Sequence, residues 1–499
     1  MTMTPERYSL AADLNISRIV TGLWQVADME RGGTMLDRGN AASVMLDYAR
    51  AGFSTFDMAD HYGSAELITG RLLERIRDGE SAGVSAVTAF TKWCPVPGPM
   101  TPEVVRAGVT RSLERLGVSC IDLLQFHWWS FEHPSYLDAM KELVVLQNEG
   151  LIRHIGVTNF DTAHLRVLVK HGIPILTNQV SFSLLDRRAQ GEMSAFCLEH
   201  GIRLLAYGTL AGGLLSAQWL GKPATAAESI EDWSKLKYKR FVDAIGGWAV
   251  LQRLLSALDA IARRHRASIP NVATRWVLEH PAVAATIVGA RLGEREHRTD
   301  NAALFDFALT PDDQAEIDAA LMGSTMLPGD CGDEYRKPPF LTASGDLSHH
   351  LSTMPKAYVA APVPGKRGRL RVSTGSVWEP LCGYSRAVRV GERILVSGTT
   401  ATNGVGEVVA PGDAAAQTVF ILDKISASLA PLGATLADVI VTRVYLQDAN
   451  DWEAVSRIHG RYFGETRPAN TLLAVSRLVG PYAVEIEAEA VVDTTDSVS

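Results

Sequence analysis

Short apolar runs alternate with amphipathic helical patterns from about residue 16 to residue 320. The segments between the runs repeat apolar residues at the helical period, as Val105, Val109 and Leu116 do. The alternation predicts an α/β fold with a (β/α)8 TIM barrel over residues 1–323. Eight runs have the character of buried strands: RIVTGLW, STFDMA, AVTAFTKW, IDLLQFHW, RHIGVTNF, ILTNQVSF, RLLAYGTL and AATIVGA.

Residues 216–248, between the last two predicted strands, break this rhythm. In a barrel of parallel strands, the segments that follow the strands lie on the face that carries the active site. We therefore expect this long segment to cover a cofactor or a substrate. A peripheral insertion without a function would give the same pattern.

The pattern changes again beyond residue 323. Residues 324–370 are rich in Pro, Gly, Ser and basic residues, which predicts a linker that is ordered in part at most. Residues 371–499 predict a small α+β domain, with a hairpin turning near Gly391 and two helices. Its last strand, AVEIEAEAVV, alternates, so Glu485, Glu487 and Glu489 should share one face.

Composition narrows the class of protein. A chain of 499 residues is too long for one hydrophobic core, so at least two domains are expected. The net charge of −8 argues against a nucleic-acid partner or an anionic membrane surface. No apolar run reaches the roughly 18–20 residues of a membrane span, and the first residues lack a signal-peptide pattern. The five cysteines show no metal-binding or disulfide spacing, so we expect a cytoplasmic protein without a metal.

Four polar residues follow or end predicted strands: Asp57, Tyr62, Lys92 and His127. Their side chains would meet at one mouth of a barrel. Reduction of a carbonyl needs a proton donor, which a tyrosine can be if a lysine ammonium beside it favours the phenolate. A carboxylate can hold the lysine, and a histidine can support the developing alkoxide. Each residue alone is more often structural, but the set in this order is specific.

Here the resemblance to the aldo-keto reductase family becomes evident. The matching stretches follow the family's order: FDMADHYGSAELITGRLL, TKW, SLERLGVSCIDLLQFHWW, GLIRHIGVTNF, NQVSFSLLDRR, LLAYGTLAGGLLS and IVGARLGEREHRTDN. The resemblance implies that Tyr62 is the proton donor and that Asp57, Lys92 and His127 complete the catalytic set. Met58 stands where the family often has Thr or Ser, between the functional positions.

The resemblance also implies a nicotinamide cofactor, and the chain has no strand-linked GxGxxG motif for a dinucleotide fold. Thr158, Asn159 and Gln179 would hold the carboxamide, and the ring would stack on Tyr207. Helix capping and core packing are the plain alternatives for these residues. The segment matching the adenosine-phosphate site contains Gly289, Arg291, Arg295, His297 and Asn301. Arg291, helped by Arg295 or His297, would suit a 2′-phosphate and favours NADPH over NADH.

Several tryptophans lie at or just after predicted strand ends. Trp24, Trp93, Trp128 and Trp129 are candidates to line an apolar pocket for a hydrophobic carbonyl compound. Packing at the rim of the barrel is the alternative for each of them.

Residues 371–493 resemble the Rid/YjgF enamine–imine deaminase family through CGYSRAVRVGERILVSG, YFGETRPANTLLAVSRL and VEIEAEAVV. The resemblance implies a chorismate-mutase-like fold and a site with Tyr384, Ser397 and Glu485. Asn470 stands where active members have an arginine, and it cannot grip a carboxylate through two charged contacts. Arg467 is a weak substitute, so an assembly module is the preferred interpretation.

The resemblance further implies a homotrimer held by this second domain, with the barrels splayed outward on the linker. Burying the face of Glu485, Glu487 and Glu489 would be costly unless a neighbouring copy supplied Arg443 or Arg477. The sequence as a whole predicts an NADPH-dependent oxidoreductase acting on a small carbonyl compound, or on the matching alcohol or sugar. A bifunctional enzyme that couples reduction to imine hydrolysis and a cofactor-sensing regulatory protein are the alternatives.

Overall fold

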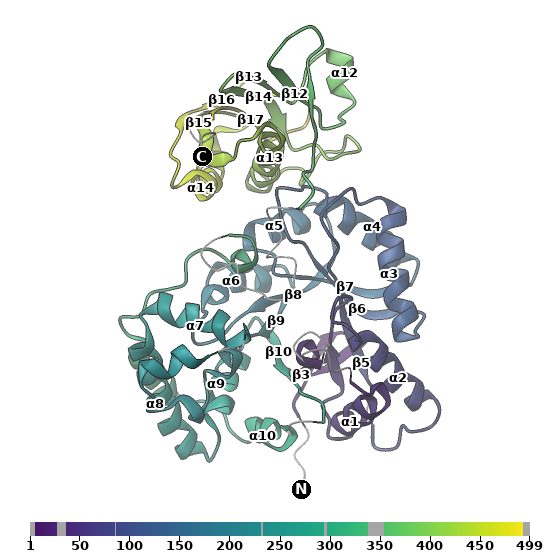
Figure 1. The fold of residues 1–499 in the computed structure, drawn as a ribbon, viewed down its shortest axis with the longest axis vertical. Coiled ribbons are helices and arrows are strands. Elements are labelled where there is room, and N and C mark those ends of the chain that lie inside the picture. The colour runs from purple at the N-terminus through teal and green to yellow at the C-terminus, as the bar shows by residue number, and fades with distance from the viewer. Residues whose placement is uncertain are drawn as a thin grey trace.

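The computed structural model describes residues 5–26, 36–84, 86–230, 233–293, 297–337 and 354–492. Two units are visible in Figure 1: a large barrel with its helices and, above it, a smaller sheet covered by helices on one side. No single helix within these ranges is long and apolar enough to cross a membrane. The bent pair Lys235–Ile245 and Trp248–His265 meets that criterion only when its two helices are taken together.

Eight parallel strands close the barrel in the order β10-β3-β4-β5-β6-β7-β8-β9, which confirms the predicted TIM barrel. Each strand falls on one of the eight predicted runs. The strands are β3 (Ile19–Gly22), β4 (Thr55–Asp57), β5 (Thr88–Trp93), β6 (Ile121–His127), β7 (Ile152–Thr158), β8 (Ile175–Ser181), β9 (Arg203–Tyr207) and β10 (Val283–Gly289). The helices are α1 (Arg38–Arg50), α2 (Ala65–Arg77), α3 (Pro102–Leu116), α4 (Tyr136–Asn148), α5 (Thr162–Lys170), α6 (Glu192–Glu199), α7 (Trp233–Ile245), α8 (Trp248–His265), α9 (Ile269–Leu278), α10 (Arg298–Ala303) and α11 (Pro311–Leu321).

Local sequence explains where these helices begin and end. In α3, the Thr101 side chain accepts a hydrogen bond from the amide of Val104, and Pro102 opens the first turn. Gly117 ends the helix with φ of 62°, a left-handed conformation that glycine adopts without strain. Val105 and Val109 are buried on the face that packs against the barrel. The predicted helical period therefore corresponds to the packed face.

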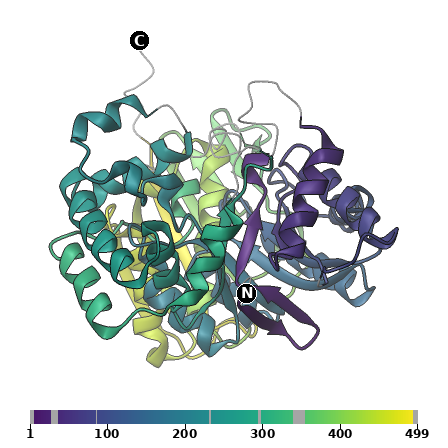
Figure 2. The same ribbon diagram turned by 90° about the horizontal axis from the view of Figure 1, so that it is seen from below.

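A hairpin that the sequence did not predict closes the bottom of the barrel. β1 (Arg7–Ala11) pairs antiparallel with β2 (Leu14–Ser17) and lies beside the N label in Figure 2. Its buried Leu10, Leu14 and Ile16 pack against Phe90 and Leu205 inside the barrel. The opposite end of the barrel, where the strands end, is therefore left without this cover.

The second domain is a seven-stranded sheet in the order β11-β12-β13-β14-β17-β15-β16. Its strands are β11 (Ala360–Pro362), β12 (Arg369–Val372), β13 (Ala387–Val390), β14 (Arg393–Thr400), β15 (Val439–Leu446), β16 (Ala469–Ala474) and β17 (Val484–Val491), and its helices are α12 (Trp378–Cys382), α13 (Ala414–Leu429) and α14 (Trp452–Phe463). The hairpin predicted around Gly391 is the β13–β14 pair. A Rid-like α+β domain is therefore confirmed.

The structure differs from the predicted linker at both of its ends. Leu327, Cys331 and Glu334 are buried against the barrel, whereas β11 and part of β12 belong to the second sheet. The polar, glycine-rich composition resembles that of a linker. Several charged side chains at the start of this stretch are instead paired in the folded chain, as Glu334 is with Arg188. Residues 338–353, between these ends, lie outside the described residues.

The two domains are docked, so the expectation that the barrels splay outward is wrong for this chain. Helix α13 packs against α5, and all sixteen of its residues are buried. Arg166 on α5 grips the Asp413 carboxylate through two nitrogens, at 3.0 and 2.7 Å. His164 on α5 lies 3.1 Å from Asp423 on α13. Paired charges and a fully covered helix hold the domains together.

Candidate active site

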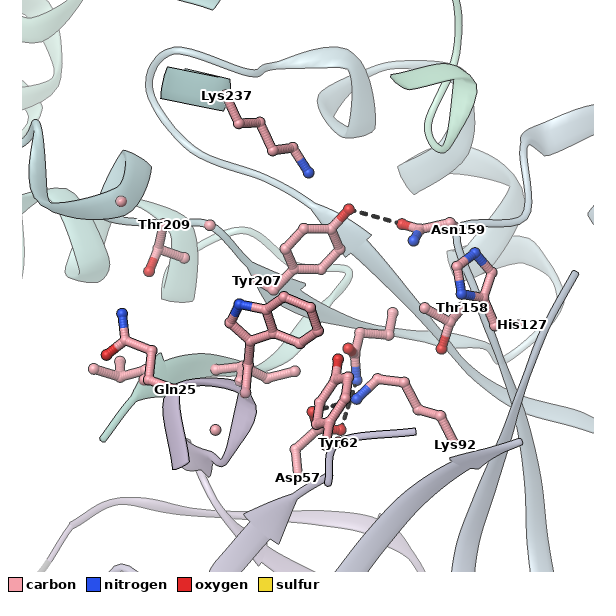
Figure 3. A pocket seen from close by; sticks show the side chains of 18 of the residues that line it. Gln25, Asp57, Tyr62, Lys92, His127, Thr158, Asn159, Tyr207, Thr209 and Lys237 are labelled. Carbon is pink, nitrogen blue, oxygen red and sulfur yellow. Dashed lines mark hydrogen bonds and ion pairs between the residues drawn. The ribbon is translucent and has the colours of Figure 1, made fainter. Parts of the chain in front are cut away.

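The four predicted catalytic residues meet in one pocket at the mouth of the barrel. Asp57 ends β4, Tyr62 follows it in the next loop, Lys92 lies in β5 and His127 ends β6. All four line a cavity of about 350 Å³ (Figure 3). Parallel strands therefore bring the four side chains together, as the sequence predicted.

Lys92 and Asp57 form a buried ion pair at the base of this pocket. The Lys92 Nζ atom lies 2.5 Å from Asp57 Oδ2 and also donates to the carbonyl oxygen of Met58 at 3.0 Å. The same Nζ atom lies 5.0 Å from the centroid of the Tyr62 ring. The carboxylate therefore fixes the ammonium group beside the phenol, where its charge favours a phenolate.

Two amides complete the surroundings of Asp57. Gln125 and Gln179 each donate from Nε2 to Asp57 Oδ1, at 2.9 and 2.8 Å. Gln125 was missed, although its position two residues before His127 on the same strand face could have indicated it. The amide nitrogen of Gln179, which we predicted to bind the cofactor, also contacts Gln125 Oε1 at 2.8 Å. Gln179 also lines the pocket. Its contact with a cofactor stays a prediction.

His127 presents an unsatisfied nitrogen in the pocket. Its Nε2 atom is buried and has no hydrogen-bond partner within the described part of the chain. Burial, and then the charge of Arg336, lowers the pKa of His127 well below its usual value. The ring is therefore neutral near pH 7 and can donate a hydrogen bond to a substrate oxygen.

The predicted aromatic pocket is correct for only some of the tryptophans. Trp24 and Trp129 line the cavity, but Trp93 and Trp128 are core residues and lie outside it. Trp93 packs so closely on α3 that a methyl group added at Gly108 would lie 2.3 Å from its indole nitrogen. Successive residues of a strand point to opposite faces, so the neighbours of inward-pointing Lys92 and His127 turn away from the mouth.

Several residues predicted to bind the cofactor line the same cavity: Thr158, Asn159, Tyr207 and Gly289. Thr158 Oγ1 is buried without a hydrogen-bond partner among the described residues. The Tyr207 hydroxyl lies 2.8 Å from Asn159 Oδ1, which holds the phenol ring at the cavity wall. An unsatisfied hydroxyl beside a fixed aromatic ring fits an amide-bearing ring such as nicotinamide.

The predicted phosphate-binding segment is only partly described. Arg291 follows β10 and is not among the residues that line the cavity. Arg295 lies outside the described residues. Asn301 lies in α10, where its backbone amide donates to the carbonyl oxygen of His297 at 2.8 Å. The roles of Arg291, Arg295 and Asn301 stay predictions.

Two further residues that line the pocket, Lys237 and Tyr335, were not among the predicted site residues. Lys237 on α7 belongs to the long segment expected to cover the site, and it donates to the hydroxyl of Tyr335 at 2.9 Å. Tyr335 lines the cavity although it follows the last barrel strand by more than forty residues. No sequence pattern links so distant a residue to the strand ends.

One group of side chains at the edge of the pocket could hold a metal ion. Asp60, His61 and Cys94 each offer one ligand atom, and these atoms lie within 4.8 Å of one another. Our expectation that the protein uses no metal therefore stays a prediction.

The predicted Rid-like site is not assembled within one chain. Asn470 in β16 donates to Thr442 Oγ1 at 2.9 Å, on the face of the sheet that the helices cover. Glu485 in β17 lies opposite Tyr445 on the other face. Burial, and then Glu487, raises the pKa of Glu485. The two residues cannot act together within one protomer.

Tyr384 and Ser397 make contacts within the domain. The Tyr384 hydroxyl accepts from Arg386 at 3.1 Å, and Ser397 donates to the carbonyl oxygen of Ser385 at 2.8 Å. The glutamate face also has partners within the chain, because Arg443 pairs with Glu487 and Arg393 pairs with Glu489. A basic residue from a neighbouring copy is therefore not required for Glu487 and Glu489, contrary to our argument for the trimer.

Comparisons with known proteins agree with the two-domain architecture. The YjgF-type "Endoribonuclease L-PSP" family model matches residues 375–492. A YjgF-family protein from Mycobacterium tuberculosis is 43% identical and aligns over 25% of this chain and 99% of its own, with a TM-score of 0.23. The glycerol dehydrogenase of Gluconobacter oxydans has a TM-score of 0.52 at 23% identity, over 66% of this chain and 98% of its own. This second structure supports the barrel fold.

The barrel also has sequence relatives. The NADH-specific methylglyoxal reductase of Escherichia coli is 26% identical over 329 residues, which cover 62% of this chain and 94% of that protein. The Aldo/keto reductase family model matches residues 18–322, which is more than half of the chain. Its four predicted catalytic residues lie together at the mouth of a closed barrel. The chain belongs to the aldo/keto reductase family and carries a YjgF-type domain after its barrel.

Proposed function

We propose that the barrel reduces aldehydes or ketones, or oxidises the matching alcohols, with a nicotinamide cofactor and with Tyr62 as the proton donor. The observation that carries this proposal is the buried Lys92–Asp57 pair next to the Tyr62 ring. The unsatisfied Nε2 atom of His127 in the same cavity supports it.

Each residue has a separate role in this proposed reaction. A carbonyl oxygen between Tyr62 and His127 receives a hydrogen bond from the neutral imidazole and the proton of the phenol. The Lys92 ammonium stabilises the phenolate left behind, and Asp57 keeps the ammonium in place. The cofactor supplies the hydride to the carbonyl carbon when it is bound. Tyr207, Thr158 and Asn159 would hold its nicotinamide ring and carboxamide.

The test of this function is the Tyr62→Phe variant, assayed for cofactor consumption over a panel of aldehydes and ketones. We expect turnover to fall by about 10²–10⁴-fold, the usual contribution of a positioned proton donor. Cofactor binding should be nearly unchanged, because the phenol ring remains. Tyr48→Phe, in α1 away from the cavity, is the matched control. Full turnover in Tyr62→Phe would refute the proposed proton donor.

For the cofactor, we propose that the chain binds NADPH in preference to NADH because Arg291 contacts the 2′-phosphate. A relative named as NADH-specific shows that the alternative occurs among similar chains. A charge-assisted hydrogen bond to the 2′-phosphate contributes about 1.5–3 kcal/mol. Arg291→Ala should therefore weaken NADPH binding by about 10–150-fold and leave NADH binding nearly unchanged. Equal losses for both cofactors would mean that Arg291 contacts a group that they share.

For the second domain, we propose an assembly role in a homotrimer. Leu395 and Leu473 are 47% and 51% exposed on the same sheet face as Glu485 and Glu489, which leaves apolar surface for a neighbour. Light scattering of the full chain should give about three times 54.0 kDa. Leu395→Lys should lower that mass, whereas Leu198→Lys on the barrel helix α6 should not. A monomeric full chain at micromolar concentration would refute the assembly role.

A further inference from the structure

A segment that follows the barrel in sequence forms part of the pocket wall. We refer to residues 330–337 as the mouth segment. Its Tyr335 ring lies 5.6 Å from the His127 ring, at an interplanar angle of 86°. The Tyr335 hydroxyl accepts from Lys237 at 2.9 Å and lies 3.3 Å from the Tyr207 hydroxyl. Tyr335 therefore stands between the catalytic histidine and the tyrosine proposed to support the cofactor.

The barrel holds this segment through buried charges. The Glu334 carboxylate is fully buried, lies 2.9 Å from Arg188 Nη2 and accepts from the Tyr207 hydroxyl at 3.1 Å. Arg336 donates to the carbonyl oxygen of Asn159 at 2.6 Å. Gly332 lies so close to the barrel that a Cβ atom there would be 2.1 Å from that same carbonyl oxygen. The fit leaves little space between the mouth segment and the barrel.

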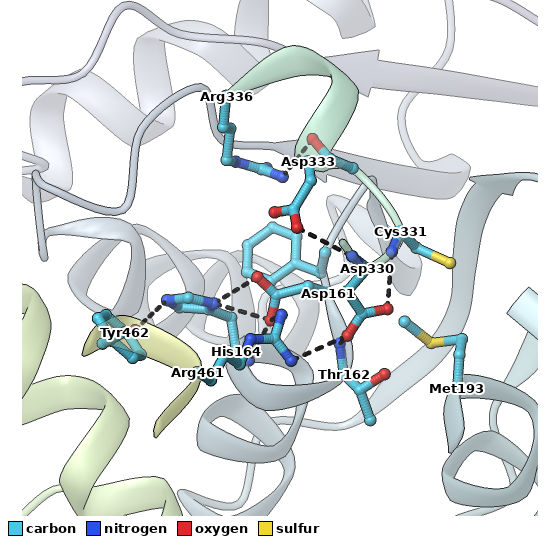
Figure 4. A network of polar contacts seen from close by, with 12 residues as sticks. Asp161, Thr162, His164, Met193, Asp330, Cys331, Asp333, Arg336, Arg461 and Tyr462 are labelled. Atoms are coloured by element: carbon cyan, nitrogen blue, oxygen red, sulfur yellow. Dashed lines mark hydrogen bonds and ion pairs between the residues drawn. The ribbon is translucent and has the colours of Figure 1, made fainter. Parts of the chain in front are cut away.

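The second domain also binds the mouth segment, at its first residue. Arg461, on α14, donates from Nη1 to Asp330 Oδ2 at 3.0 Å, and its Nη2 lies 3.4 Å from Asp161 Oδ1 (Figure 4). The same Oδ2 of Asp330 accepts the backbone amide of Thr162 at 3.0 Å. Arg461 is thus a cation of the second domain placed between two carboxylates of the reductase half.

These contacts form a continuous path from the second domain to the pocket. The Asp330 carbonyl oxygen accepts from Arg188 at 2.9 Å, and the same guanidinium binds Glu334. Without Arg461, Asp330 and buried Asp161 would lose their shared cation and repel each other. The start of the mouth segment would move, and Tyr335, five residues further on, would lose its fixed position.

We propose that the second domain completes the reductase pocket: Tyr335 is a specificity-determining wall residue, and Arg461 is the positioning residue that holds it there. The proposal rests on the proposed carbonyl reduction. Tyr335 limits the size of the substrate beside His127. Release of the mouth segment would enlarge the pocket, so bulky carbonyl compounds would gain relative to small ones.

The test compares kcat/KM for propanal and for 2-naphthaldehyde in full-length variants. Tyr335→Ala should raise the ratio of the bulky to the small substrate by about 10–200-fold, as expected for a changed pocket contact. Arg461→Gln should raise it in the same direction by about 2–30-fold, the range for residues that act through others. Arg461→Lys keeps the charge and should restore part of the wild-type ratio.

Arg457→Gln is the matched control, because Arg457 lies on the same helix and, within the described part of the chain, forms its ion pair with Glu453 of that helix. In the double variant Tyr335→Ala/Arg461→Gln, the ratio should not rise beyond that of Tyr335→Ala, since both changes act through one side chain. If Arg461→Gln does not fold, Asp330→Asn breaks the same ion pair from the barrel side and takes its place.

The outcomes separate this proposal from the proposed function. If Arg461→Gln keeps the wild-type ratio while Tyr335→Ala changes it, the positioning role is wrong. If Tyr335→Ala also keeps the ratio, Tyr335 is not a specificity residue. If the wild-type chain reduces neither aldehyde nor any other carbonyl compound in the panel, the proposed function fails first. A general loss of activity in Arg461→Gln at an unchanged ratio would point to a merely structural contact.

Discussion

Replacing Lys92 by methionine separates the structural and the catalytic roles of the buried pair. The Lys92 and Asp57 side chains are 3% and 5% exposed, so neither charge is screened by solvent. Methionine fills a similar volume without a charge. The change leaves the Asp57 carboxylate buried, and among the described residues the amides of Gln125 and Gln179 remain as the hydrogen-bond donors to Oδ1.

The magnitude follows from these contacts. Loss of one partner of a buried ion pair costs about 3–5 kcal/mol of folding free energy. We expect the lower end of that range here, because the two amides continue to stabilise the carboxylate. The loss of the ammonium beside Tyr62 should lower kcat by about 10²–10⁴-fold, which corresponds to about 2.7–5.4 kcal/mol in the activation barrier.

The double variant Lys92→Met/Asp57→Asn distinguishes the two effects. It removes both charges and keeps an oxygen to accept the amide hydrogen bonds, so stability should recover most of the loss. Activity should not recover, because the phenol still lacks its ammonium. Urea unfolding followed by tryptophan fluorescence measures the first quantity, and steady-state cofactor consumption measures the second.

Two results would refute this reasoning. If Lys92→Met is as stable as the wild type, the Lys92 ammonium does not stabilise the buried Asp57 carboxylate. A double variant that regains turnover along with stability would show that Lys92 acts only as a structural residue. In that case the role proposed for it in activating Tyr62 would have to be abandoned.

Two further predictions concern packing and pH. Gly70→Ala should destabilise the chain by about 1–3 kcal/mol, because the new Cβ would lie 2.4 Å from the Arg115 carbonyl oxygen. Gly460→Ala in α14, with no atom within 4 Å of the new Cβ, should instead be neutral or stabilising by up to about 1 kcal/mol. Urea unfolding of both variants measures the two changes. Burial lowers the pKa of His164, but Asp161 and Asp423 outweigh it and raise that pKa above its usual value. The His164 contribution to stability is therefore complete below about pH 6.5 and is lost as the pH rises through the raised pKa. His164→Gln should flatten this part of the pH–stability profile, and an unchanged slope would contradict the assignment.

The barrel and its tetrad could be predicted because the information is local. Each strand is a short apolar run, and each catalytic side chain ends or follows such a run, so the topology alone brings them together. The errors at Trp93 and Trp128 were avoidable, since strand alternation already placed them opposite Lys92 and His127. The position of Gln125 could have been found by the same argument.

The mouth segment could not be predicted in this way. Its sequence, DCGDEYRK, is polar and contains a glycine, as linkers do. Glu334 and Arg336 are buried only because Arg188 and backbone carbonyl groups of the barrel receive them. Such pairings join residues more than a hundred positions apart, and no periodicity records them. The docking of the second domain was missed for the same reason.

The packing of helix α13 on α5 has a consequence for the synthesis of the protein. Helix α13 buries one surface of α5, yet it is translated long after α5. The interval from Leu321, where the last helix of the barrel ends, to Leu429 is 108 residues, or roughly 5–22 s at typical rates of translation. A nascent barrel that folds in that time exposes the α5 surface, with Asp161 and His164 still without Asp423 and Arg461. The ribosome-bound chain should therefore pass through a stage at which this surface is open to chaperones, and it closes only when the last quarter of the sequence arrives.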